Sequence, residues 1–134
     1  MRHGFGTFVL TIATLFFLLT AWSSGTAPEK FAEQLGLRIM NAGGYNEIRA
    51  QYAAFFLVAA AVCAAALAGS VARQSAYVLL IVIFGGLIVG RLVSLALNGG
   101  FAGYSPTIVA LYAVDAIGFT LALTALAVDR QGSL

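Results

Sequence analysis

Four charged residues lie within or at the edge of strongly apolar stretches of this 134-residue sequence. Glu47 and Arg49 open one stretch, Arg91 lies in the next and Asp115 in the last. A charge at the centre of a bilayer costs ~2.5–3.5 kcal/mol on insertion scales, so such groups face a protein interior and pair with one another. The signs match, two acids against two bases, and we expect Arg91 and Asp115 to pair first.

Polar side chains extend this set of charges at helical spacing. Residues three or four apart share a helix face, which groups Gln51 with Glu47 and Tyr52 with Arg49. Glu47 and Arg49 are two apart, so they point in different directions and would serve different partners. The full candidate site consists of Glu47, Arg49, Gln51, Tyr52, Arg91, Ser94, Tyr112 and Asp115.

Composition places these residues in lipid and not in water. Hydrophobic residues make up 61% of the chain, charged residues 9%, and the mean hydropathy is +0.97. Soluble domains carry about a quarter of charged residues, so a soluble globular domain and a disordered chain are excluded. The net charge of +2 comes from few residues and gives no basic surface, which argues against nucleic acid as a partner. Membrane lipids are the expected surroundings.

Four apolar stretches have the length of membrane-spanning helices. They cover residues 5–22, 48–69, 76–97 and 107–128, and about 20 helical residues cross the ~30 Å hydrocarbon core. A chain in lipid must satisfy its own backbone hydrogen bonds, so these spans are helices. The predicted fold is an all-α, four-helix transmembrane bundle that forms one domain over residues 1–134. Antiparallel succession puts all four charged residues in one half of the membrane.

The connection after the first span contains a further predicted helix, over residues 28–40. A proline at its start suits the first helical turn. Phe31, Leu35 and Ile39 recur at helical spacing, so we interpret the segment as a short amphipathic helix at the membrane interface. Residues 41–44, Asn-Ala-Gly-Gly, are expected to end it. A structured loop without membrane contact is the alternative.

Basic residues favour cytoplasmic termini by a small margin. Three arginines lie on the side of the termini, against one lysine and one arginine on the other side and a further arginine at a helix edge. The first stretch begins like a secretory signal peptide. Its long apolar run, and the proline that would follow a cut, favour a retained helix.

Residues that commonly catalyse reactions or bind metals are scarce. The one histidine, His3, lies in the N-terminal tail, and the one cysteine, Cys63, lies in an apolar run as a small buried hydrophobe. The sequence has no Cys/His metal set, no Ser-His-Asp set, no phosphate loop and no dinucleotide fingerprint. We therefore expect no enzyme activity and no metal site, and the sequence indicates no cofactor.

Gly86 and Gly90 form a GxxxG pattern in the third stretch. Small residues at this spacing let a neighbouring helix approach closely. Helix packing within the chain is the favoured interpretation, and formation of a homo-oligomer is the alternative.

Two segments carry a resemblance to a known family. They are residues 46–52 (NEIRAQY) and 85–95 (GGLIVGRLVSL), accompanied by the acidic Asp115 in the last stretch. With them, the chain resembles the small four-helix bacterial membrane proteins grouped as the domain of unknown function DUF4345. The resemblance implies four helices and a bacterial inner-membrane location, and it implies no activity. Ala53 and Ala54 stand where the family is associated with glycines, and Asp115 where glutamate is more usual.

Two functions are compatible with the charged residues. In the first, a balanced ion-pair network fixes helix register, and the protein is a non-enzymatic structural or accessory subunit packing against itself or a larger inner-membrane complex. In the second, the same residues line a pocket for a lipid headgroup, a small amphiphile or a proton. The balance of charges favours the first function. A water-accessible cavity that reaches Arg91 and Asp115 would favour the second.

Overall fold

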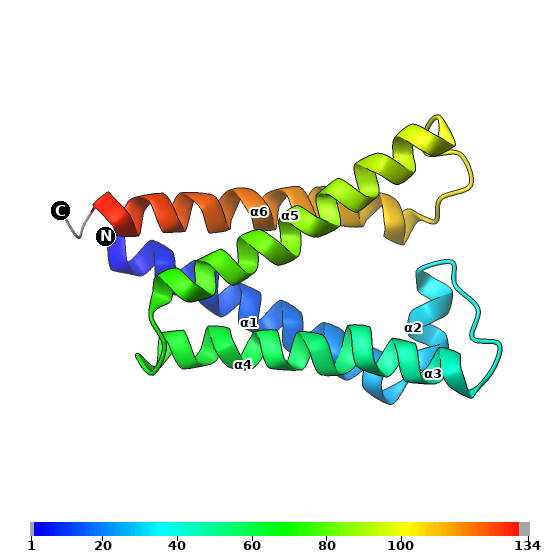
Figure 1. Ribbon diagram of the computed structural model, residues 1–134, viewed down its shortest axis with the longest axis horizontal. Helices are drawn as coiled ribbons and strands as arrows, with labels where there is room; N and C mark the ends of the chain where they lie inside the picture. Colours follow the sequence, from blue (N-terminus) through cyan, green and yellow to red (C-terminus); the bar gives the residue numbers. More distant parts are fainter. Residues whose placement is uncertain (1, 132–134) are drawn as a thin grey trace.

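The structure, a computed structural model, describes residues 2–131, and the regular elements of this range are helices. In chain order they are α1 (Arg2–Thr26), α2 (Pro28–Gln34), α3 (Ala42–Ile48), the π-helix η1 (Arg49–Ala54), α4 (Phe55–Leu67), α5 (Arg73–Asn98) and α6 (Pro106–Gln131) (Figure 1). Three of these elements, α3, η1 and α4, follow one another without a break and together form the second long helical segment.

These elements confirm the predicted all-α bundle with four apolar spans. The segments long and apolar enough to cross a membrane are Gly4–Thr26, Ala42–Leu67, Arg73–Asn98 and Pro106–Gln131. Most of them exceed the predicted stretches, because backbone hydrogen bonding continues past the last apolar side chain into the polar flanks. His3 lies outside the residues whose side chains are described.

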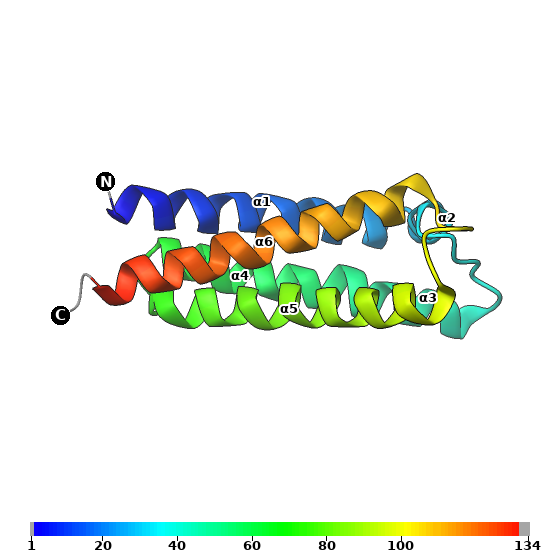
Figure 2. The ribbon, with the colours of Figure 1, turned by 90° about the horizontal axis from the view of Figure 1, so that it is seen from above.

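The four long segments form two pairs, α1 with α4 and α5 with α6, and the pairs meet along α1–α6 and α4–α5 (Figures 1 and 2). Their shared core lies toward one end of the bundle. It includes Leu10, Phe17, Tyr77 and Leu80, together with Cys63, which is fully buried as the sequence predicts. We call this the closed end of the bundle.

The two helix pairs diverge from the closed end toward the opposite, open end, where α2 lies (Figure 1). The closed end holds the start of α1, the end of α6 and the turn between α4 and α5. There, Nη1 of Arg73 on α5 donates a hydrogen bond to Oγ1 of Thr7 on α1, at 3.1 Å. The hydroxyl of Tyr77 also packs so closely on Gly6 that a Cβ there would lie 2.1 Å from it. Polar and apolar contacts thus join the pairs at this end.

The predicted helix over residues 28–40 is shorter in the structure, because Gly36 stops it. Gly36 has a φ of +74°, a left-handed conformation that favours glycine. Its N–H donates to the carbonyl of Glu33 at 2.9 Å, and the N–H of Leu37 donates to that of Ala32 at 2.8 Å. This double hydrogen bond is the Schellman arrangement that ends helices, so α2 ends at Gln34.

The expectation that residues 41–44 end a helix was wrong, because they begin one. The side chain of Asn41 accepts a hydrogen bond from the N–H of Gly44 at 3.1 Å and forms the N-cap of α3. Asparagine is a strong N-cap residue, since its oxygen satisfies an orphan N–H of the first turn. The second span consequently starts earlier than the sequence predicts.

The second span contains one π-helical segment, η1. The N–H of Phe55 at its end donates to the carbonyl of Ala50, five residues earlier. The wider π turn changes the direction of the side chains that precede it relative to those that follow it in α4. Such segments are rare and occur often at functional sites.

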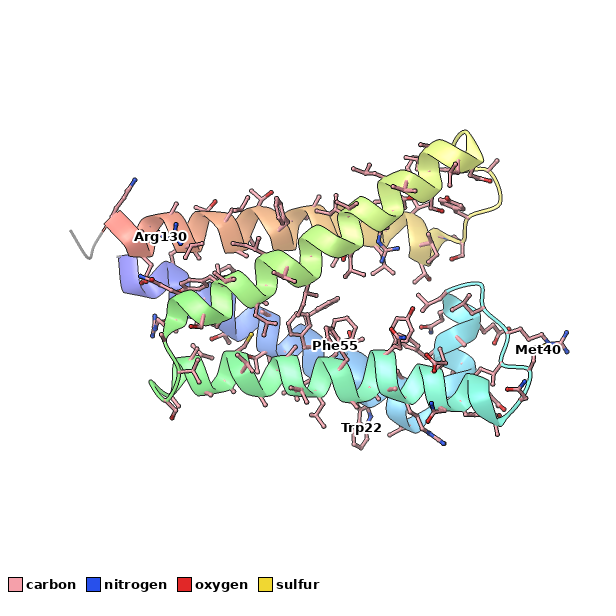
Figure 3. The ribbon with its side chains drawn as sticks, in the orientation of Figure 1. Trp22, Met40, Phe55 and Arg130 are labelled. Atoms are coloured by element: carbon pink, nitrogen blue, oxygen red, sulfur yellow. The ribbon has the colours of Figure 1, made fainter. Side chains whose placement is uncertain are left out.

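Large apolar side chains cover the outer surface, as a bundle in lipid requires. Trp22 is 71% exposed and Met40 78% exposed, and both point away from the bundle (Figure 3). The outward side chains therefore match a lipid environment.

Candidate functional site

An ion pair between Arg91 of α5 and Asp115 of α6 lies in the open half of the bundle. Nε of Arg91 donates to Oδ2 of Asp115. The Asp115 side chain is 2% exposed and the Arg91 side chain 18% exposed, so the carboxylate is enclosed while the guanidinium retains open space beside it. This central ion pair is the one expected first from the sequence.

Tyr112, one helical turn before Asp115, supports the central ion pair from a second side. Its hydroxyl donates to the main-chain carbonyl of Arg91 at 2.7 Å. Its ring lies 5.7 Å from the guanidinium carbon of Arg91, within the range of a cation–π contact. Tyr112 therefore holds both the backbone and the charge of Arg91 against α6.

The other two predicted charges, Glu47 and Arg49, do not join the central ion pair. Glu47 is exposed and accepts a hydrogen bond from Nε2 of Gln51 at 3.2 Å, as their four-residue spacing predicts. The guanidinium carbon of Arg49, also exposed, lies 5.6 Å from the ring centre of Tyr45. The expected four-charge network is therefore absent from the described part of the chain.

The π-helix explains where these side chains go. Arg49 and Tyr52 are three apart and would share a face of an α-helix, but η1 turns more slowly, so three residues fall well short of one turn. Tyr52 faces the bundle interior, with its ring centre 5.2 Å from that of Phe31 on α2. An aromatic side chain, not a charge, is what the second span presents to the interior.

Ser94, the remaining predicted residue, contacts the turn between α5 and α6. Its hydroxyl lies 2.9 Å from that of Tyr104. Tyr104 stacks on Tyr112 with ring centres 6.4 Å apart. Ser94 thus connects to the central ion pair through these two tyrosines.

A cavity of about 490 Å³ lies between the two helix pairs and reaches the central ion pair. Most of its wall is apolar. Its lining residues come from the helical elements α1, α2, η1, α4, α5 and α6 and from the loop after α2: Phe16, Thr20, Phe31, Gln34, Leu35, Leu37, Tyr52, Phe56, Gly86, Leu87, Gly90, Arg91, Thr107, Ile108, Leu111 and Asp115. We call this space the main cavity.

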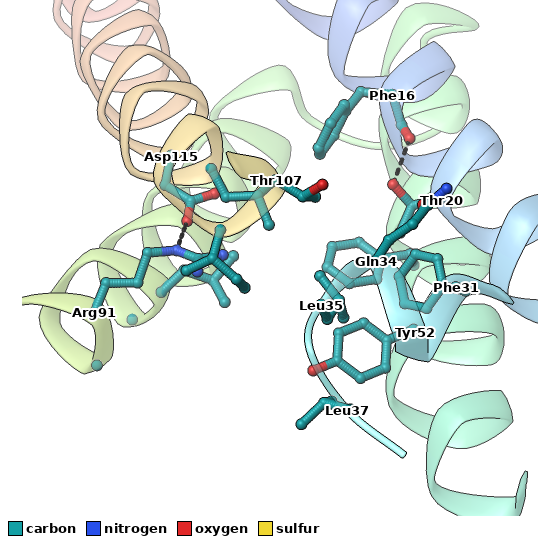
Figure 4. Close-up of a pocket in the computed structure, with 16 residues that line it drawn as sticks. Phe16, Thr20, Phe31, Gln34, Leu35, Leu37, Tyr52, Arg91, Thr107 and Asp115 are labelled. Atoms are coloured by element: carbon teal, nitrogen blue, oxygen red, sulfur yellow. Dashed lines mark hydrogen bonds and ion pairs between the residues drawn. The ribbon is translucent and has the colours of Figure 1, made fainter. Parts of the chain in front are cut away.

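The main cavity has its charged groups on one wall and aromatic groups on the other (Figure 4). Arg91 and Asp115 lie on the side of α5 and α6. Phe31 and Tyr52 face them from α2 and η1, and the Tyr52 hydroxyl points into the space between (Figure 4). Phe31 and Leu35 therefore turn the apolar face of α2 toward the cavity, a role that the sequence did not reveal beyond their helical spacing.

The glycine pair Gly86 and Gly90 also lines the main cavity. A Cβ built on either glycine would meet nothing within 4 Å. No neighbouring backbone approaches them, so they do not pack helices together within the described chain, contrary to the favoured interpretation of the GxxxG pattern. Close packing of α5 on α6 occurs instead at Gly118, where a Cβ would lie 2.7 Å from the ring of Phe84.

Two polar contacts hold α2 over the open end. The hydroxyl of Ser105, in the α5–α6 turn, donates to the carbonyl of Gln34 at 3.1 Å. The hydroxyl of Tyr45 on α3 donates to the carboxylate of Glu29 on α2. The helix α2 is thus tied to both helix pairs and forms one side of the main cavity.

Metal ligands do not converge in the part of the chain that the structure describes. No group of three or more His, Cys, Asp or Glu side chains lies close enough together to hold a metal ion there. The main cavity is an apolar space with a few polar groups on one wall.

Four helices that are long and apolar enough to cross a membrane place the chain among the α-helical membrane proteins. Residues 5–126 match the family described as "Domain of unknown function (DUF4345)", and since the match covers nearly the whole chain, the protein belongs to that family. No curated protein and no solved structure matches the chain.

Proposed function

We propose that this protein is a non-enzymatic membrane protein that binds a small amphiphilic molecule in the main cavity. The observation that carries the proposal is the cavity of about 490 Å³ that reaches Arg91 and Asp115. This volume lies within the roughly 300–1,000 Å³ of ordinary ligand pockets. A structural or accessory subunit, the function favoured by the charges alone, would need the ion pair but not the cavity.

The chemistry of the wall supports an amphiphilic occupant. Water alone is a poor occupant, because most of the wall offers no hydrogen-bond partner. A molecule with an apolar body and one polar end matches the wall.

The test uses a glycine that can be enlarged without strain. Gly90 lines the main cavity, and a Cβ there meets no atom within 4 Å, so we expect the leucine side chain of Gly90→Leu to occupy part of the cavity. Gly4 is equally open but lies at the closed end of α1, so Gly4→Leu is the matched control.

Each variant is extracted with its surrounding lipid in polymer-bounded discs, and the small molecules released are quantified by mass spectrometry. We expect one amphiphile to accompany the wild type and Gly4→Leu at close to one per chain, and to fall at least ten-fold in Gly90→Leu. Identical profiles for all three proteins would refute the proposal and favour the structural or accessory function.

We also propose that the protein resides in the bacterial inner membrane, with the closed end facing the cytoplasm. The small excess of arginine on the side of the termini supports this orientation. Because Cys63 is buried, a cysteine introduced at Ser70 in the α4–α5 turn, or at Gly103 in the α5–α6 turn, would be the accessible thiol. An impermeant maleimide applied to intact cells should label the Gly103 variant only, and labelling of the Ser70 variant alone would reverse the orientation.

A further inference from the structure

We infer that the occupant of the main cavity is a single-chain amphiphile with an anionic headgroup, and that the guanidinium of Arg91 binds this headgroup. The inference rests on the proposed function and names the ligand class and the recognition residue. Its support comes from the unused donors of Arg91, the enclosure of Asp115, a second cavity beside Arg91, and the size of the main cavity.

Arg91 has hydrogen-bond donors left over. Within the described chain, only its Nε donates to a protein acceptor. Every buried side-chain nitrogen or oxygen there has a partner, so the two Nη nitrogens border accessible space. A guanidinium presents paired N–H groups that match both oxygens of a carboxylate or phosphate. The edge of Arg91 that faces the cavity is thus ready to bind an anion.

Asp115 orients Arg91 without competing for the ligand. Its carboxylate holds Nε and is 2% exposed, so a cationic headgroup has little access to it. Arg91 and Asp115 are the only ionisable charged residues in the wall of the main cavity. The accessible charge in the site is therefore positive, and Asp115 is a positioning residue.

A second cavity of about 350 Å³ adjoins the main cavity at Arg91. Four residues line both cavities: Leu35, Gly90, Arg91 and Ile108. The second cavity adds side-chain hydroxyls to the wall, from Ser94, Tyr104, Ser105 and Tyr112. Arg91 thus stands where an apolar chamber meets a hydroxyl-lined space, the boundary at which the polar end of an amphiphile would rest.

The volume of the main cavity matches a single apolar chain. At about 30 Å³ for each water-sized group, 490 Å³ holds about 16 such groups. A methylene group is of similar size, so the space matches one acyl chain. Fatty acids and lysophospholipids share this chemistry, a single chain with an anionic end.

The experiment measures binding of oleate, of 1-oleoyl lysophosphatidate and of neutral methyl oleate by native mass spectrometry, each at the same mole fraction in detergent micelles. We expect the wild type to bind the better of the two anions about 10- to 100-fold more tightly than methyl oleate. This ratio corresponds to the usual contribution of hydrogen bonds to a charged group. The tighter anion identifies the headgroup as carboxylate or phosphate.

The recognition residue is tested with a variant that removes both charges and keeps the shapes, Arg91→Gln with Asp115→Asn. This double variant should bind methyl oleate as wild type does and lose the preference for the anion. Arg38→Gln is the matched control, because Arg38 is exposed at the same end of the bundle and lines neither cavity. If the double variant does not fold, Arg91→Lys serves, since it keeps the charge but lacks the paired donors, and the preference should fall several-fold.

Two failures are distinguishable. Equal binding of anion and ester by wild type, or a preference that survives in the double variant, overturns the assignment of Arg91. If Gly90→Leu still weakens the binding of both anion and ester in that case, the main cavity remains a binding site and the proposed function stands. If Gly90→Leu weakens neither probe, the probes bind only at the lipid-facing surface and the proposed function fails with the inference.

Discussion

Replacement of Asp115 by asparagine isolates the charge of the central ion pair. Asparagine has nearly the shape of aspartate, and its oxygen can still accept a hydrogen bond from Nε of Arg91. What disappears is the negative charge that neutralises Arg91 inside the bundle. The variant therefore tests whether the pair holds α5 and α6 together.

The magnitude follows from the exposure of the two side chains. Breaking a fully buried pair costs about 3–5 kcal/mol, and an exposed pair contributes about 0–1 kcal/mol. Asp115 is 2% exposed, but Arg91 is 18% exposed and borders the main cavity. We therefore expect Asp115→Asn to lower the free energy of unfolding by about 2–3 kcal/mol, between these limits.

The assay is reversible unfolding in mixed micelles of increasing dodecyl sulfate content, followed by far-ultraviolet circular dichroism. Arg91→Gln and the double variant complete a mutant cycle, in which we expect a coupling energy of about 1–3 kcal/mol. Glu33→Gln, on the exposed side of α2, is the control and should change stability by less than about 0.5 kcal/mol. A coupling energy no larger than this control would refute the conclusion that the central ion pair fixes the two helices.

Three further predictions concern backbone positions and use the same unfolding assay. Gly118→Ala should destabilise the bundle by about 1–3 kcal/mol, because the added Cβ would lie 2.7 Å from the Phe84 ring. A neutral result would mean that α5 and α6 can separate freely at this position. Gly86→Ala should be neutral or stabilising by up to about 1 kcal/mol, since the position is open and helical; destabilisation would indicate a neighbour packed on it. Gly36→Ala should weaken the end of α2, and Asn41→Ala the start of α3, and each should lower the free energy of unfolding by about 1 kcal/mol. Unchanged stability would argue against these caps.

The sequence predicted the features that depend on local pattern and on the cost of charge in lipid. The four spans follow from apolar runs of sufficient length. The pairing of Arg91 with Asp115 follows from opposite charges at similar depth on two helices joined by a short turn. Both conclusions need only the helical rise and the antiparallel order of the chain.

Other features depended on backbone geometry that composition does not encode. The π-helix directs Tyr52 inward and leaves Glu47 and Arg49 at the surface, and a run such as RAQYAA carries no clear signal for a π turn. The end of α2 has a local signal in the sequence, because Gly36 directly follows Leu35, the C-cap residue. The longer Asn-Ala-Gly-Gly run resembles a stop but instead caps the next helix.

The cavity was the least predictable feature, because it arises from how the helix pairs diverge and not from any single segment. At the closed end, small and aromatic side chains such as Ala13, Phe17 and Ala122 are buried between the pairs. At the open end, Gly86 and Gly90 present no side chain to fill the space, and Arg91 pairs with Asp115 on the neighbouring helix α6 and does not reach across. Helix α2, tied to both pairs, bounds this space. The same glycines that suggested tight helix contacts in the sequence therefore line the volume in which we propose that a ligand binds.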